Sequence, residues 1–323
     1  MRVAVTGATG RLGRALVHAL EEAPFSGPRG PLAWTRAELD LDAPAGVAVA
    51  LDRDRPEVVV HAAAWTDVDG CAREPELALA RNGVATGVLA AACAARGVEL
   101  VIVSTNEVFD GRRTDGQGYA ATDKPSPANP YGASKLAGER AASEAFGARA
   151  GSALGIARTS WLFGPPGRDF PDKILDAAAG AQATGQPLRV VADEWGSPTS
   201  TADLAEAIVE LLAENAHPGL HHLVDGGFAS RAEWAAEVLR VARVDMPVEP
   251  VPAATWSRPS RPPRWGVLAP TPLPSGEPMR PWQQALADQA VRLRRTADDA
   301  RHRAVEDRGP SGERATAAPG SGR

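Results

Sequence analysis

The sequence is short of cysteine and of long apolar runs, and each shortage excludes a class of protein. Its 323 residues include two cysteines, Cys71 and Cys93, whose spacing fits neither a disulfide framework nor a zinc site, so we expect no bound metal. The longest apolar runs, such as Val58–Val60 and Leu100–Val103, are too short to cross a bilayer. The net charge of −5 argues against a nucleic-acid-binding surface. With no secretory signal at the N-terminus, we expect a cytoplasmic protein without membrane or nucleic-acid partners.

Apolar segments rich in β-branched residues alternate with helix-like segments in the first half of the chain. Strands are predicted at residues 2–6, 31–35, 57–61, 100–104 and 153–159, and helices at 11–22, 75–95 and 131–146. Continuous apolar strands are typical of sheets covered on both faces, and alternation with helices implies right-handed crossovers between parallel strands. The sequence therefore predicts an α/β fold with a Rossmann-type doubly wound parallel sheet.

The second half predicts a smaller C-terminal α/β region. Strands are predicted at residues 188–192 and 220–224, and capping patterns that begin at Ser200 and Ser230 predict helices to 214 and 241. The proline-dense stretch 247–281 is predicted to be irregular. Residues 295–323 are charged and then rich in glycine, proline, serine and alanine, which predicts a disordered tail.

A glycine-rich turn, GATGRLG, stands between the first predicted strand and the first helix. A helix N-terminus at this place can bind a pyrophosphate through its backbone N–H groups. The GxxGxxG spacing is that of the short-chain dehydrogenase/reductase superfamily, although a glycine turn without a ligand is the alternative. The residues predicted to contact a dinucleotide here are Gly7, Thr9, Gly10, Arg11, Leu12 and Gly13.

The end of the second predicted strand bears on the choice between NADP(H) and NAD(H). No acidic residue stands there to bind an adenosine 2′-hydroxyl; Arg36 stands there instead and could meet a 2′-phosphate. The pattern favours NADP(H), with NAD(H) as the alternative cofactor and a solvated surface arginine as the alternative interpretation. Asp40 and Leu41 are predicted to line the adenine pocket.

Tyr131-Gly-Ala-Ser-Lys135 places a phenol and an ammonium four residues apart on one helix face, in a chain with only two tyrosines and three lysines. A lysine cation, together with an oxidised nicotinamide, stabilises a phenolate and lowers the pKa of the phenol. Thr105, at the carboxyl end of a predicted strand, can donate a hydrogen bond to a substrate carbonyl. We therefore predict Thr105, Tyr131 and Lys135 as catalytic residues; an exposed Tyr–Lys pair and a threonine cap are the alternatives.

These motifs together resemble the dTDP-4-dehydrorhamnose reductase family, which belongs to the extended short-chain superfamily. The matching segments are HAAAWTDVD at 61–69, STNEVFDG at 104–111, YGASKLAGE at 131–139, RTSW at 158–161 and GSPT at 196–199. The resemblance runs from residue 1 to about residue 290. It implies NAD(P)H-dependent reduction of the C4 ketone of a dTDP-4-keto-6-deoxyhexose, with Tyr131 as the proton donor.

The resemblance also implies where the ligands lie. The residues beside the cofactor would include Ala62, Ala63, Ala64, Asn82, Tyr131 and Lys135. Trp161 would pack on the sugar ring, and Arg261 could meet the diphosphate. The family usually has Asp-Tyr after the Ser-Thr pair, whereas this chain has Asn106 and Glu107, which should alter hydrogen bonding to the sugar.

The expected organisation is an NAD(P)-binding domain at 1–160, a partly interleaved substrate-binding region at 161–294 and the tail at 295–323. The expected partner is a nucleotide sugar, and a homodimer is a possible assembly. Three alternative functions stay open: a sugar-nucleotide epimerase or dehydratase with tightly bound NAD, a reductase of small non-nucleotide carbonyls, and a non-catalytic NADP-binding regulatory subunit like that of methionine adenosyltransferase.

Overall fold

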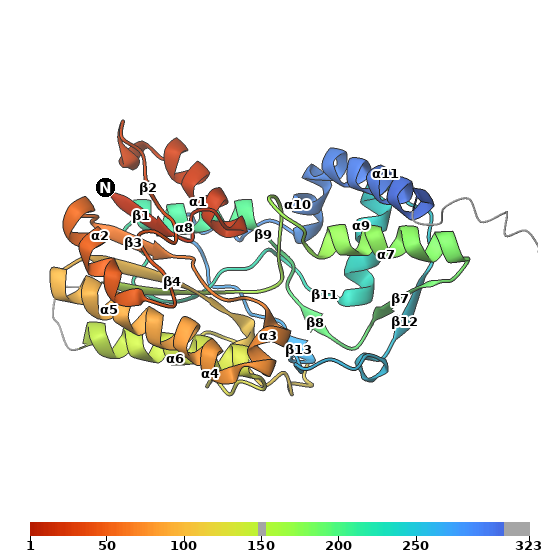
Figure 1. The fold of residues 1–323 in the computed structure, drawn as a ribbon, viewed down its shortest axis with the longest axis horizontal. Helices are drawn as coiled ribbons and strands as arrows, with labels where there is room; N and C mark the ends of the chain where they lie inside the picture. The colour runs from red at the N-terminus through yellow and green to blue at the C-terminus, as the bar shows by residue number, and fades with distance from the viewer. Residues whose placement is uncertain (148–152, 307–323) are drawn as a thin grey trace, which may run out of the picture.

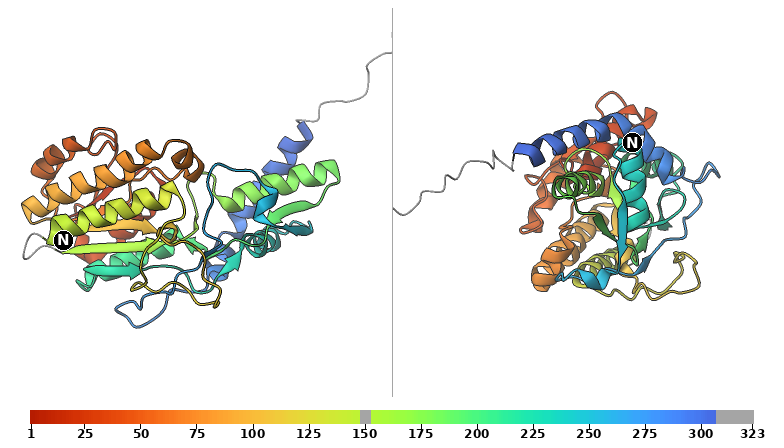
Figure 2. Two further views of the ribbon diagram at one scale, coloured as in Figure 1. Left: turned by 90° about the horizontal axis from the view of Figure 1, so that it is seen from below. Right: turned by 90° about the vertical axis from the view of Figure 1, so that its right-hand side faces the viewer.

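The protein has two lobes that lie side by side (Figure 1; Figure 2, left). The computed structural model describes residues 1–147 and 153–306. One lobe is a parallel sheet between two layers of helices, and the other packs helices around a separate apolar core.

Within the described residues the main sheet has six parallel strands in the order β10-β5-β4-β3-β1-β2. The strands are β1 Val3–Thr6, β2 Leu32–Trp34, β3 Val58–His61, β4 Glu99–Thr105, β5 Leu154–Thr159 and β10 Gly219–His222. The chain runs from β1 to β2 on one side and returns to β3 on the other side of β1. The strand order therefore reverses between β1 and β3, the place where open α/β sheets bind ligands. The predicted Rossmann-type doubly wound sheet is confirmed.

Helices cover both faces of this sheet. One face carries α1 (Arg11–Glu22) and α8 (Thr201–Ala213), which bury leucines against the strands. The other face carries α2 Val47–Asp54, α5 Ala85–Arg96 and α6 Pro130–Gly147. Because α8 and β10 come late in the chain, the first lobe is not one continuous segment.

The helix that ends in α5 is unusually apolar. It runs from α4 (Pro75–Ala78) through a π-helical turn, η3 (Leu79–Val84), into α5. It is long and apolar enough to cross a membrane, but half of its most apolar stretch is buried inside the protein. The helix packs against α6 and the sheet, so it is a core helix of the first lobe.

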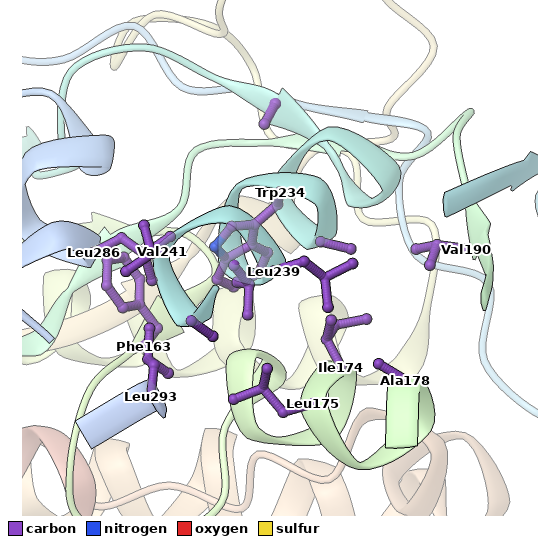
Figure 3. Packing of buried hydrophobic residues seen from close by; sticks show 14 of the residues in the cluster. Phe163, Ile174, Leu175, Ala178, Val190, Trp234, Leu239, Val241, Leu286 and Leu293 are labelled. Atoms are coloured by element: carbon purple, nitrogen blue, oxygen red, sulfur yellow. The ribbon is translucent and has the colours of Figure 1, made fainter. Parts of the chain in front are cut away.

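The second lobe has its own core, with Trp234 at its centre (Figure 3). Its helices are α7 Phe170–Thr184, α9 Arg231–Ala242, α10 Trp282–Asp288 and α11 Ala290–Glu306. Ile174 and Leu175 of α7 pack with Leu239 and Trp234 of α9, and Leu286 and Leu293 belong to the same cluster. The short elements are α3 Val68–Arg73, β6 Leu162–Phe163, β7 Leu188–Val191, β8 Trp195–Gly196, β9 Thr199–Ser200, β11 Ala229–Ser230, β12 Val248–Val251 and β13 Trp265–Gly266, with 3₁₀ turns η1 Pro24–Ser26, η2 Pro44–Gly46, η4 Asn106–Val108 and η5 Ala253–Thr255.

Two predictions about the C-terminal part are wrong. The stretch predicted to be irregular contains β12, which pairs in parallel with β7, and β13, which pairs with β8. Residues 295–306 are not disordered, because α11 buries Leu293, Ala297 and Ala300 at helical spacing against the second lobe. Such a narrow apolar stripe in a charged segment forms a helix only when packing supports it. The rest of the predicted tail, 307–323, lies outside the described residues.

Candidate active site

The glycine turn is packed so tightly that side chains do not fit at two of its glycines. Gly7 has φ 66°, and a Cβ atom there would lie 2.9 Å from the backbone of Ala63. A Cβ atom on Gly13 would lie 2.1 Å from the carbonyl oxygen of Gly7. Helix α1 begins directly after Gly10, which forms no side-chain cap, so the first N–H groups of the helix are left for another acceptor. These N–H groups, at the positive end of the helix dipole, fit a dinucleotide pyrophosphate. We call the turn formed by Gly7, Gly10 and Gly13 the glycine cradle.

A cavity of about 620 Å³ opens where the carboxyl ends of the strands meet this turn. The predicted site residues that line it are Gly7, Gly10, Arg11, Leu12, Gly13, Ala62, Ala64, Thr105, Asn106, Glu107, Tyr131, Lys135 and Trp161. They come from segments that are far apart in the sequence. The volume is typical of small-molecule sites.

Helix α6 places Tyr131 and Lys135 on the wall of this cavity. Asn129 fixes the start of the helix by accepting a hydrogen bond from the N–H of Gly132, at 2.9 Å. A Cβ atom on Gly132 would lie 1.9 Å from the carbonyl oxygen of Glu107, so glycine lets the helix touch the loop after β4. The Thr105 hydroxyl, which accepts from the N–H of Glu107 at 3.2 Å, lies on the same cavity as the phenol of Tyr131.

The electrostatics keep the phenol protonated. Burial, followed by the nearby Glu107 carboxylate, raises the pKa of Tyr131, while the hydrogen bond from Thr105 opposes the rise. The lowering that we predicted is therefore not produced by the protein side chains alone. Burial lowers the pKa of Lys135 to about 8, against the attraction of Glu139. A protonated phenol beside a buried amine is the state that a proton donor needs at neutral pH.

A buried ion pair lies behind Lys135. Arg158 of β5 donates to both carboxylate oxygens of Glu139, at 2.9 and 2.6 Å, and Ser104 donates to one of them at 2.5 Å. Glu139 and Arg158 are 4% and 3% exposed. The pair ties α6 to β4 and β5, which fixes the catalytic helix relative to the ends of the strands.

Asn82 and Ala63 were predicted to contact the cofactor, but neither lines the cavity. The side chain of Asn82 accepts from the N–H of Trp65 at 2.8 Å and donates to the carbonyl of Trp65 and the hydroxyl of Ser134, at 3.0 and 3.1 Å. The N–H of Ala63 donates to the Thr6 hydroxyl at 3.2 Å. In this structure both residues hold the loop after β3 in place.

Five further predicted site residues do not line the cavity: Thr9, Arg36, Asp40, Leu41 and Arg261. Arg36 is exposed beyond the end of β2 and forms ion pairs with Asp40 and Asp42, at 3.4 and 3.5 Å. Arg261 lines a separate surface groove of about 860 Å³. The structure therefore does not bring Arg261 to the catalytic side chains, and its contact with a diphosphate stays a prediction.

Three cavity-lining cations were missed by the sequence analysis: Arg168, Lys173 and Arg231. A capping box between Asp169 and Asp172 starts α7 at the cavity wall and brings Arg168 and Lys173 there. The scarcity of lysine could have singled out Lys173. Nothing in the local sequence marks Arg231, which the fold places over the Trp161 ring.

Comparison with known proteins places this site in a family. Residues 1–295 match the family described as RmlD substrate binding domain. The chain belongs to this family. The chain is 36% identical over 293 residues to a dTDP-4-dehydrorhamnose reductase from Streptomyces griseus, covering 88% of this chain and 91% of that protein. It is 37% identical over 266 residues to a dTDP-4-keto-6-deoxy-D-glucose reductase from Streptomyces niveus, covering 82% and 87%.

Solved structures agree with the sequence relatives. A dTDP-4-dehydrorhamnose reductase from Bacillus anthracis in complex with NADP superimposes with a TM-score of 0.78 at 30% identity, covering 90% of this chain and 99% of that chain. A Clostridium acetobutylicum reductase of the same name gives a TM-score of 0.80 at 30% identity, covering 91% and 99%. The resemblance predicted from the motifs is confirmed.

Proposed function

We propose that this protein reduces the C4 ketone of a dTDP-4-keto-6-deoxyhexose with NADPH. The observation that carries the proposal is the convergence of Thr105, Tyr131 and Lys135 with the glycine cradle in one cavity. The presence of Thr105, Tyr131 and Lys135 together in this cavity weighs against a binding protein without catalysis. The relatives named as sugar-nucleotide reductases support the same reaction.

Each of the three side chains has a distinct part in the proposed chemistry. Thr105 donates a hydrogen bond to the substrate carbonyl, and Tyr131 transfers its phenolic proton to the oxygen as negative charge develops there. Lys135 places a cation beside the phenolate that remains. A bound NADPH supplies the hydride for C4. The cradle at Gly7, Gly10 and Gly13 would hold its pyrophosphate, and Lys135 would contact its ribose.

The substrate would occupy the part of the cavity lined by Asn106, Glu107 and Trp161. Asn106 is already engaged, because its side-chain amide donates to the carbonyl of Gly266 at 2.9 Å. Trp161 has a left-handed backbone, with φ 44°, a conformation that non-glycine residues adopt mainly at functional or strained sites. The expectations of a cytoplasmic location and a homodimer stay predictions.

NADPH oxidation tests the proposal directly. Purified protein is mixed with dTDP-4-keto-6-deoxyglucose or its epimer dTDP-4-dehydrorhamnose, with NADPH and NADH in parallel, and absorbance of the reduced nicotinamide is followed. We expect oxidation that falls by about 10²- to 10⁴-fold in Tyr131→Phe, because that variant lacks the proton donor. NADPH binding, measured by fluorescence, should persist in the variant. Binding without oxidation of either ketosugar in the wild-type protein would contradict the proposal.

A further inference from the structure

Arg231 is a half-buried cation: its side chain is 22% exposed and packs on aromatic rings. Its guanidinium carbon lies 3.7 Å from the ring centroid of Trp161, with Phe170 and Trp234 at 5.4 and 6.0 Å. The nearest carboxylate oxygen, on Glu194, is 3.7 Å from Nε, beyond a hydrogen bond. Across the part of the chain that the structure describes, Glu194 is the one carboxylate within ion-pair distance of this guanidinium, and the two Nη groups make no hydrogen bond. They belong to a residue that lines the catalytic cavity.

Glu107 contributes a carboxylate to the same cavity. One of its oxygens accepts a hydrogen bond from the side-chain amide of Asn129, at 2.6 Å. Its backbone N–H donates to the Thr105 hydroxyl at 3.2 Å, which fixes the residue beside the catalytic threonine. Its charge acts on the phenol of Tyr131, and the charge of Arg231 acts on Glu107. Glu107, Arg231 and Tyr131 all line the same cavity.

The guanidinium of Arg231 also reduces the surface of Trp161 on which a ligand could stack. It covers one face of the indole, and the backbone of Gly196 is packed so close to the ring that a Cβ atom there would lie 2.4 Å from it. A sugar in the cavity meets the donors of Arg231 rather than a bare indole face. Hydrogen bonding to Arg231, more than stacking on Trp161, therefore determines how a sugar binds on this side of the cavity.

The charges around this wall are mixed. The carboxylates of Glu107 and Glu194 interact electrostatically with Arg231 and Arg258, and Arg258 also pairs with Asp69 at 3.2 Å. A site for a phosphate needs an excess of positive charge, which this group lacks. A balanced carboxylate–guanidinium pair suits a neutral hydroxyl, which donates one hydrogen bond and accepts others.

We propose that Glu107 and Arg231 form a specificity-determining pair that recognises the hydroxyl on the carbon next to the reacting carbonyl. The inference rests on the proposed function, because Thr105 and Tyr131 then fix the carbonyl oxygen beside Glu107. The hydroxyl donates to the carboxylate and accepts from the guanidinium. A sugar without this hydroxyl leaves the guanidinium and one carboxylate oxygen without that partner in the cavity, and such sites reject the lacking analogue strongly. In a 4-keto-6-deoxyhexose the recognised group is the C3 hydroxyl, since C5 carries the methyl group.

The test compares a dTDP-4-keto-6-deoxyhexose with its 3-deoxy analogue. The wild-type protein should prefer the hydroxylated sugar by at least about 100-fold in kcat/KM. Glu107→Met and Arg231→Met should reduce this preference below about tenfold, mainly by losing the hydroxylated substrate through a raised KM. Arg240→Met is the matched control, because Arg240 lies on the same helix, is exposed and pairs only with Glu237 among its described neighbours. It should keep the full preference.

A binding measurement separates this inference from the proposed function. Calorimetric titration of NADP⁺-loaded protein with the 4-hydroxy products, dTDP-6-deoxyhexose and its 3-deoxy form, should show the same preference and its loss in both variants. If the protein binds the hydroxylated product more tightly than the 3-deoxy product but turns over neither ketosugar, the reductase function is refuted and the role of Glu107 and Arg231 in recognising the hydroxyl is kept. Equal binding or turnover of the two sugars by the wild-type protein, or an unchanged preference in both variants, would overturn the inference. If a methionine variant is unfolded by circular dichroism, Glu107→Gln or Arg231→Lys takes its place under the same criteria.

Discussion

Replacing Lys135, the predicted catalytic lysine, should make this protein more stable at neutral pH. Lys135 is 6% exposed, and burial lowers its pKa from 10.5 to about 8. The folded protein therefore disfavours the ammonium that the unfolded chain accepts readily. At about 1.4 kcal/mol for each pKa unit, the penalty on the charged form is about 3 kcal/mol. Lys135→Met removes the charge, keeps an unbranched side chain in the same space and should gain up to this amount.

The effect should depend on pH in a defined direction. Below pH 8 the lysine is charged in both the folded and the unfolded state, so the wild-type protein carries the whole penalty. Between pH 8 and 10.5 the folded protein loses the proton while the unfolded chain keeps it, and the wild-type stability rises relative to the variant. The advantage of Lys135→Met should therefore be largest at pH 7 and shrink towards pH 10.5.

Urea unfolding of the two proteins at pH 7, 9 and 10.5 measures this difference. NADPH oxidation should be lost in the variant at every pH. Lys124→Met serves as the control, because it removes an exposed lysine and should change stability by less than about 0.5 kcal/mol. A variant of Lys135 that is less stable than the wild type at pH 7, or a gain that stays constant up to pH 10.5, would refute the reasoning.

Two further predictions concern the cofactor. Gly13→Ala puts a Cβ atom 2.1 Å from the Gly7 carbonyl oxygen, so NADPH binding by fluorescence titration should be lost and Tm should fall; Gly180→Ala, with nothing within 4 Å on α7, should instead stabilise by about 0.5–1 kcal/mol. Arg36→Ala should lower kcat/KM for NADPH by about tenfold and leave NADH unaffected, because only NADPH carries the 2′-phosphate. An equal change in kcat/KM for NADPH and NADH would show that Arg36 does not recognise the 2′-phosphate.

The parts of the site that follow one another closely in the chain were predictable from spacing. The glycine turn has to lie between a strand and a helix, and an i, i+4 pair has to share a helix face, so spacing alone was enough to place Gly7, Gly13, Tyr131 and Lys135. The parallel, doubly wound character of the sheet also followed from the alternation of apolar segments and helices. These features depend on local backbone geometry, which a short stretch of sequence specifies.

The charged residues of the C-terminal part were not predictable in the same way. Residues 295–306 contain arginines and aspartates around a narrow apolar stripe, and only packing on the second lobe turns that stripe into α11. β12 forms because its residues pair in parallel with β7. Neither partner is visible in the local pattern, because both contacts join segments that are distant in the chain.

Local spacing and alternation were enough to predict the glycine turn, the Tyr131–Lys135 pair and the parallel sheet that presents them. Which other side chains line the cavity depends on tertiary packing. Packing places Arg231 over the ring of Trp161, puts Glu107 on the same cavity and hydrogen-bonds the side chain of Asn82 to Trp65 and Ser134. The spacing of the predicted catalytic residues depends on local backbone geometry. The wall of the cavity is assembled from segments that are distant in the sequence, and the packing of two separate cores determines where those segments meet.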